Sequence, residues 1–143
     1  MDTLAAAELA RHHQIHGVQP VLPVADVQAA VHWFCRTLGF EADFVFPEHA
    51  RVKLGDRTFG DPIYIHLSLS VGAIDPCGET RLHVGHDIDG LHAHVLASGA
   101  TVLQAPVDRP WGLREMVLLA PAGHRLCLAA EVHAQPASAS APA

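Results

Sequence analysis

The first side chains that could do chemistry lie on an alternating segment. In residues 63–70, IYIHLSLS, apolar and polar residues alternate, which predicts a strand with Tyr64, His66, Ser68 and Ser70 on one face. An imidazole at position 66 could ligate a metal, donate a proton to a substrate, or form part of the wall of a cleft. We favour the role of His66 as a wall residue of the cleft, because a neutral imidazole is commonly hydrogen-bonded by a neighbouring hydroxyl, such as that of Ser68 or Tyr64.

A second candidate is the loop residue Trp111, which lies between Pro110 and Gly112. An aromatic side chain on a loop beside a cleft is a platform on which a planar or cationic ligand can stack. Packing over the mouth of the fold or in a dimer interface is supported about equally. Arg114 and Glu115 follow and could orient a ligand, although charged residues at a strand start are usually solvated or paired.

The other reactive residue types form no recognisable catalytic pattern. Cys127 is one of three cysteines, which are far apart and without a CxxC pair, so neither a disulfide framework nor a zinc knuckle is indicated. We expect Cys127 to behave as a small buried hydrophobe. His92 and His94 are two apart in a predicted helix and cannot share a metal. No Ser-His-Asp order, phosphate loop or carboxylate pair supports a hydrolase or a nucleotide-dependent enzyme.

The elements that position these residues follow one plan, which first appears in residues 18–46. Residues 18–24 predict a strand, and Pro20 and Pro23 favour an edge or hinge position for it. Asp26 caps a helix that ends at Gly39. Residues 40–46 predict the next strand. On this strand, alternation places four side chains on one side: Phe40, Ala42, Phe44 and Phe46.

The second half of the chain repeats the plan. Asp87 or Asp89 caps a helix through Ser98, Gly99 ends it, and strands are predicted before and after it at 81–85, 101–103, 113–119 and 124–131. The predicted fold is therefore α+β, a tandem of two βαβββ modules. We divide the chain into an N-terminal extension (1–15), a first module (16–72), a linker (73–79), a second module (80–132) and a disordered tail (133–143).

Composition narrows the range of partners. The formal charge is −6, with only 9 Lys and Arg residues, which argues against nucleic acid or an anionic membrane surface as a partner and favours a cationic small ligand. The apolar runs are too short to span a bilayer, and the N-terminus lacks a basic region followed by an apolar core. We therefore expect a cytoplasmic protein.

Three segments carry a resemblance to a known family. They are QPVLPVADVQAAVHWFCRTLGFEADF, HDIDGLHAHVLASGATV and RPWGLREMVLLAPAGHRL. They resemble the vicinal-oxygen-chelate superfamily of glyoxalases, bleomycin-resistance proteins and dioxygenases, in particular its bleomycin-resistance-like branch. The resemblance implies paired βαβββ modules that form half-open barrels, and a homodimer with ligand sites in its clefts. It also implies that the N-terminal strand is exchanged between subunits about Pro20.

The same resemblance implies four metal positions, which fall here on Gln19, His66, Thr80 and Cys127. A divalent ion bound by nitrogen and oxygen ligands usually has at least one carboxylate and two histidines in its ligand set. This set has no carboxylate, although Glu115 could supply one from the adjacent strand. We therefore expect neither a metal nor another cofactor.

The resulting hypothesis is a metal-free homodimer that sequesters a small, cationic or aromatic molecule. The ligand-binding residues that we predict are Phe44, Phe46, Tyr64, His66, Trp111 and Arg114. By resemblance, Trp111 and Phe44 line the ligand groove. The alternative is a metal-dependent glyoxalase-type or dioxygenase-type enzyme with an unusual ligand set built on Gln19 and His66. A ligand-sensing or interaction module is a third possibility.

Overall fold

The computed structural model describes residues 6–7, 17–55, 58, 60–76 and 78–132. The first half contains β1 (Val21–Val24), α2 (Val27–Leu38), β2 (Glu41–Val45), β3 (His49–Leu54) and β4 (Ile63–Leu69). The second half contains β5 (Glu79–His83), α3 (Ile88–Ala97), β6 (Thr101–Asp108), β7 (Leu113–Leu119), the 3₁₀ turn η1 (Pro121–Gly123) and β8 (Arg125–Glu131). The predicted extension and tail lie outside the described residues, apart from Ala6 and Ala7.

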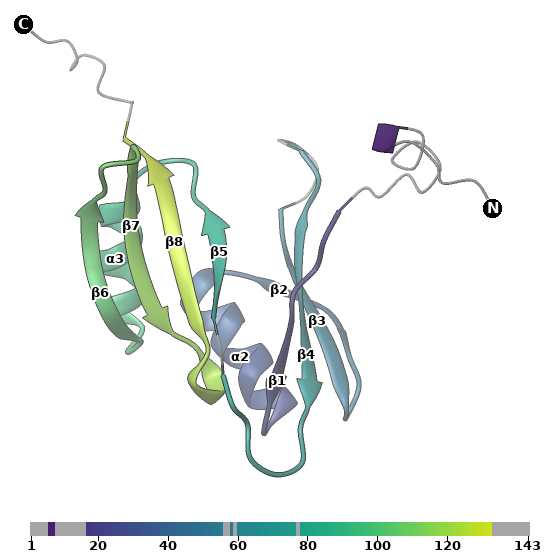
Figure 1. Ribbon diagram of the computed structural model, residues 1–143. Helices are drawn as coiled ribbons and strands as arrows, with labels where there is room; N and C mark the ends of the chain where they lie inside the picture. Colours follow the sequence, from purple (N-terminus) through teal and green to yellow (C-terminus); the bar gives the residue numbers. More distant parts are fainter. Residues whose placement is uncertain (1–5, 8–16, 56–57, 59, 77, 133–143) are drawn as a thin grey trace, which may run out of the picture.

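The strands form two four-stranded sheets of the same topology, β1-β4-β3-β2 and β5-β8-β7-β6. In each sheet the strand before the helix pairs in parallel with the last strand, and the other pairings are antiparallel. Helix α2 packs on the first sheet and α3 on the second (Figure 1). The predicted α+β tandem of βαβββ modules is confirmed. Within the described residues, no helix is long and apolar enough to cross a membrane.

Helices α2 and α3 each begin at a capping aspartate. Asp26 accepts a hydrogen bond from the backbone N–H of Ala29 at 3.0 Å, and Gly39 ends α2 in the left-handed region with φ 75°. Asp87, rather than Asp89, caps α3 by accepting from the N–H of Gly90 at 3.1 Å. A Cβ at position 90 would lie 2.3 Å from an Asp87 carboxylate oxygen, so this cap requires glycine.

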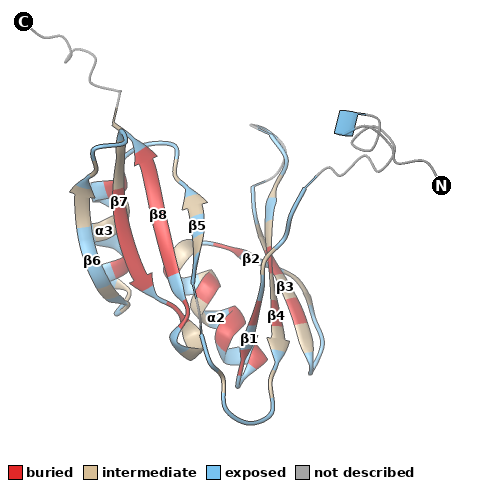
Figure 2. Cartoon of the chain, in the orientation of Figure 1, coloured by how far each residue is buried: buried red, intermediate tan, exposed pale blue. Residues whose placement is uncertain are grey.

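One hydrophobic core runs through both modules. Phe34 of α2 is fully buried, and its ring meets that of Phe40 edge-on with centroids 5.4 Å apart. The same cluster of buried residues includes Leu67 of β4 and Met116 and Leu128 of the second sheet. Figure 2 shows buried segments on α2 and on strands of both sheets. The two modules therefore bury a shared core.

Strand β4 has the predicted alternation, whereas β2 does not. Ile65 and Leu67 of β4 are buried, and Tyr64 and His66, which alternate with them, lie on the other face and are half-buried. In β2, the register shifts between Ala42, opposite Val52, and Phe44, opposite Arg51. This β-bulge reverses the facing of the strand, because an extra residue moves each later side chain to the other face.

The bulge therefore overturns the expectation that four residues share one side of β2. Phe40 is in the core, whereas Phe44 and Phe46 contact each other outside it, with ring centroids 5.7 Å apart.

Strand β1 lies at an edge, as its prolines predict, and pairs with β4 of its own chain. Its outer side is joined to the second module, because Nε2 of the buried His124 donates to the Pro23 carbonyl oxygen at 2.7 Å.

The observed bounds of two strands in the second module differ from the predicted ones. Strand β5 starts at Glu79, and β6 continues past Leu103 to Asp108 through further register shifts.

Candidate functional site

Each sheet has one face on its helix and one open face. On the first sheet, the residues that alternate with buried Ile65 and Leu67 are on the open face. The strand register places Arg51 opposite His66, and His49 opposite Ser68. The name "first open face" is used below for the surface formed by six side chains: Gln19, Phe44, His49, Arg51, Tyr64 and His66.

A chain of hydrogen bonds crosses this face. Nε2 of His66 lies 2.7 Å from Oε1 of Gln19, and Nδ1 of His66 lies 2.8 Å from Nε2 of His49. An amide oxygen only accepts, so we assign the proton of His66 to Nε2. Nδ1 of the neutral ring then accepts from His49. The hydroxyl partners expected for His66, on Ser68 or Tyr64, are thus replaced by Gln19 and His49.

The environment of His66 favours its uncharged form. Burial is the main cause that lowers the pKa of His66, and the nearby His49 and Arg51 lower it further. A neutral ring with its proton on Nε2 is compatible with both hydrogen bonds, to Gln19 and to His49. His66 therefore presents no free nitrogen lone pair while both bonds persist.

Aromatic side chains surround this imidazole pair. The ring of Phe44 stacks on His49 with centroids 6.1 Å apart and meets His66 edge-on at 6.3 Å. Phe46 extends the cluster and is 62% exposed. Exposed aromatic surface of this kind binds planar or apolar groups.

Arg51 occupies the centre of the face. Its guanidinium carbon lies 4.2 Å from the Tyr64 ring centroid and 5.3 Å from that of Phe44. The Asp43 carboxylate accepts from its Nε at 2.8 Å and from Nη2 at 2.5 Å. The bulge brings Asp43 to this position. The positive charge is thus held between two rings and balanced by one carboxylate.

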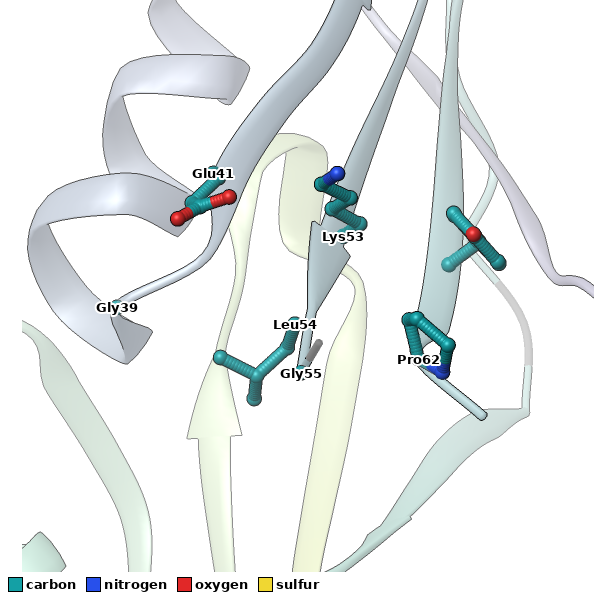
Figure 3. Close-up of a pocket in the computed structure, with 7 residues that line it drawn as sticks. Gly39, Glu41, Lys53, Leu54, Gly55 and Pro62 are labelled. Carbon is teal, nitrogen blue, oxygen red and sulfur yellow. The ribbon is translucent and has the colours of Figure 1, made fainter. Parts of the chain in front are cut away.

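A cavity of about 490 Å³ adjoins Tyr64 at the end of the face. Figure 3 shows Glu41 and Lys53 on adjacent strands, with Leu54 and Pro62 beside them. Gly39 and Gly55 complete the lining. The cavity therefore combines one acid, one base and apolar surface.

The second sheet carries a different cluster on its open face. Glu115 is only 5% exposed, and its Oε2 accepts from the indole N–H of Trp111 at 2.8 Å and from Arg81 at 2.5 Å. Nε of Arg109 lies 3.5 Å from Oε1. The Trp111 hydrogen bond and then Arg81 hold the pKa of Glu115 below its usual range, although burial opposes them.

Two further residues singled out in the sequence differ in their position: Arg114 lies apart from both clusters, and Cys127 borders the second one. Arg114 faces α3, where it bonds Asp89 and Asp108, each at 2.9 Å. Cys127 is buried on β8 between the register partners Arg81 and Val117, and burial raises the pKa of its thiol. Cys127 is thus a small buried residue, as expected.

The four metal positions implied by resemblance do not assemble in this chain. Gln19 and His66 meet on the first sheet, whereas Thr80 and Cys127 belong to the second. The side chain of Thr80 shares a strand face with Leu82, which packs on the core. Among the described residues, no three His, Cys, Asp or Glu side chains gather as a metal site would require. The donors present do not fit that site.

Sequence reasoning missed His49, Arg51, Asp43, Arg81 and Arg109. A signal existed for two of them, because His49 and Arg51 alternate with the apolar Ala50 and Val52. Asp43 could not be predicted without knowledge of the bulge that brings it to Arg51. Arg81 and Arg109 could not be predicted without the tertiary contacts that bring them to Glu115.

Comparisons with known proteins agree with this architecture. A model of the Glyoxalase/Bleomycin resistance protein/Dioxygenase superfamily matches residues 14–128. No curated protein matches the chain. The bleomycin-binding protein from bleomycin-producing Streptomyces verticillus, solved with copper(II)-bleomycin, is 29% identical over 82% of this chain and 95% of its own, with a TM-score of 0.63.

Two further structures share the fold. A glyoxalase-related enzyme from Clostridium phytofermentans is 23% identical, covers 82% of this chain and 96% of its own, and has a TM-score of 0.68. A glyoxalase/bleomycin resistance protein/dioxygenase from Nocardioides is 18% identical, covers 89% of this chain and 93% of its own, and has a TM-score of 0.63.

Proposed function

We propose that this chain, which belongs to the glyoxalase/bleomycin resistance protein/dioxygenase superfamily, is a binding protein of the bleomycin-resistance type. It sequesters a small cationic or aromatic molecule and performs no reaction on it. The net charge of −6 and the exposed aromatic side chains suit such a ligand. The 29% identity to a protein solved with copper(II)-bleomycin supports the same function.

The observation that carries this proposal is the bonding of the first open face. Both ring nitrogens of His66 are engaged, by Gln19 and by His49, and burial lowers the pKa of the ring, which favours its neutral form. Asp43 is committed to Arg51. Polar groups that are already satisfied and lie among aromatic rings form a binding wall, whereas an ion requires free donors aimed at one point.

The ligand contacts in this proposal come from both open faces. A homodimer would place the first open face of one subunit opposite the second open face of its partner. The proposed contacts are Phe44, Phe46, Tyr64, His66 and Trp111. Light scattering of the purified protein tests the dimer, because a monomer at micromolar concentration would leave each face without the other.

The binding experiment is calorimetric titration with copper(II)-bleomycin. Phe44→Ala and Trp111→Ala should each weaken binding about tenfold or more, since each removes an aromatic contact. Leu96→Ala is the matched control, because Leu96 is an exposed apolar residue on α3. Copper chloride alone must be titrated too, because the chain contains 12 histidines. The absence of binding at micromolar concentration would reject this ligand.

One contact favours the alternative, a metal-dependent glyoxalase-type or dioxygenase-type enzyme. The side chains of Gln19 and His66, which fall on the first two metal positions of the superfamily, lie within 2.7 Å of each other. Elemental analysis of protein purified without a histidine tag discriminates the two functions. One equivalent of Ni, Zn, Fe or Mn, with activity restored on reconstitution, would support the enzyme and contradict sequestration.

A further inference from the structure

We infer that Glu115 is a positioning residue, which holds the exposed Trp111 indole as a rigid stacking platform for an uncharged planar aromatic ring of the ligand. Arg81 in turn holds Glu115. This inference rests on the proposed function for its ligand, but the fixed indole is a property of the protein alone.

The side chains form a chain from a buried anchor to an exposed ring. The Glu115 side chain is 6% exposed, whereas Trp111 is 63% exposed. A single carboxylate oxygen, Oε2, accepts from both the Trp111 indole at 2.8 Å and Arg81 at 2.5 Å. A charged acceptor makes a stronger bond than a neutral one, so the indole edge is fixed from beneath.

The backbone beneath Trp111 is fixed as well. The N–H of Arg109 donates to the Leu113 carbonyl at 2.8 Å, and the N–H of Gly112 donates to the Arg109 carbonyl at 3.1 Å. Gly112 has φ 89°, a conformation that glycine adopts without strain. The backbone that carries the Trp111 side chain is therefore held by hydrogen bonds on both sides of the residue.

Burying a carboxylate is costly, and this one has a specific use for its bonds. Arg81 compensates the charge of Glu115, and the carboxylate accepts a charge-assisted hydrogen bond from the Trp111 indole. A free exposed indole would lose rotational freedom when a ligand stacks on it. Fixing the ring in advance removes that loss from the binding step, which raises affinity without any new contact.

The surroundings of the ring select the class of ligand. The guanidinium carbon of Arg109 lies 5.9 Å from the Trp111 ring centroid. A bare cation at this ring would be repelled by Arg109. A planar uncharged ring can stack on the remaining exposed surface and is tolerated beside a guanidinium. The cationic part of a ligand belongs elsewhere in the cleft.

The decisive measurement is made without ligand. In a Trp33→Phe background Trp111 is the one tryptophan left, since the chain has two. We expect its indole N–H to exchange with solvent at least tenfold more slowly than in the Trp33→Phe, Glu115→Ala double variant. Fluorescence anisotropy decay should gain a fast component in the double variant. Equal exchange rates and equal anisotropy in both folded proteins would overturn the inference.

Three further variants keep the test specific. Glu115→Gln retains an acceptor oxygen and should restore most of the slow exchange. Arg81→Gln removes the charge that holds Glu115 and should accelerate exchange even where Glu115→Ala fails to fold. Glu79→Ala is the matched control, because Glu79 also pairs with Arg81, at 3.2 Å, but has no hydrogen bond to Trp111. This control should leave the Trp111 exchange rate unchanged.

The ligand class is tested with two probes. Caffeine, a planar uncharged heteroaromatic, should quench Trp111 fluorescence in the millimolar range, and Glu115→Ala should weaken this binding severalfold. Tetramethylammonium should not quench. Equal responses to both probes, or none to caffeine, would overturn the ligand class. Failure of copper(II)-bleomycin to bind would count against the proposed function, whereas the exchange measurement would still decide the role of Glu115.

Discussion

At the scale of single residues, the chemistry of the first open face depends on one proton position. With the His66 proton assigned to Nε2, this nitrogen donates to Gln19 and Nδ1 accepts from His49. Protonation would add a second N–H to His66, so His49 would have to accept instead of donate, and it would put a positive charge beside Arg51. Both effects favour the neutral ring.

Stability should accordingly fall in mild acid. The pKa of His66 in the folded protein is lowered from its ordinary value of 6.5. Between the folded and the unfolded pKa, the unfolded chain therefore binds more protons than the folded one. The free energy of unfolding should decrease as the pH falls through this window and level off below the folded pKa. Urea denaturation from pH 8 to pH 5 measures it.

The His66→Gln variant should lose part of this pH dependence, because it removes the group that titrates. His86→Gln, at an exposed position, is the control and should keep the dependence of the parent protein. If His66→Gln and the parent share one pH profile, another group causes the loss of stability.

At the scale of elements, a cap and a bulge position the first open face. Gly39 ends α2 and turns the chain into β2, where the bulge then brings Asp43 to Arg51 and Phe44 to the imidazole pair. A β2 strand without the bulge would send Phe44 to the core side. Local backbone geometry thus decides which aromatic ring reaches the ligand.

The Gly39→Ala substitution should destabilise the protein by about 1 kcal/mol, because alanine is strained at φ 75°. A Cβ at this position would have no atom within 4 Å, so the cost comes from the backbone and not from a clash. Urea midpoints measure the change. Gly17→Ala, where a Cβ also meets nothing, is the control, and an equal loss in both variants would contradict this explanation.

At the scale of the whole molecule, one contact joins two distant parts of the chain. His124, in the turn between β7 and β8, donates to the Pro23 carbonyl on the edge strand of the other sheet. His124 is 7% exposed, so the bond lies in a largely dry environment. Together with the shared core, it ties the edge strand β1 to the second module.

Removal of this bond should weaken both parts together. His124→Ala leaves the Pro23 carbonyl without its donor and should cost about 1–3 kcal/mol. Hydrogen exchange at the Ser70 amide, which bonds the Val24 carbonyl beside this contact, should accelerate in the variant. His83→Ala, an exposed position on β5, should change neither quantity. Unchanged exchange at Ser70 would show that β1 does not depend on the contact.

Much of the fold was predictable, because the signals involved are local. The caps at Asp26 and Gly39, the alternation of residues 63–70 and the repetition of one plan in both halves all depend on spacings of a few residues. These spacings determined the secondary structure and, through its repetition, the tandem modules.

Only the tertiary structure decided which side chains meet. Glu115 accepts a hydrogen bond from Arg81, which is 34 positions away in the chain, and His66 is hydrogen-bonded to Gln19, which is 47 positions away. Such pairings depend on strand register, and one inserted residue in β2 was enough to reverse the facing of Phe44. Register is set by how the sheets pack on their shared core, so it follows from the whole molecule and not from any short segment.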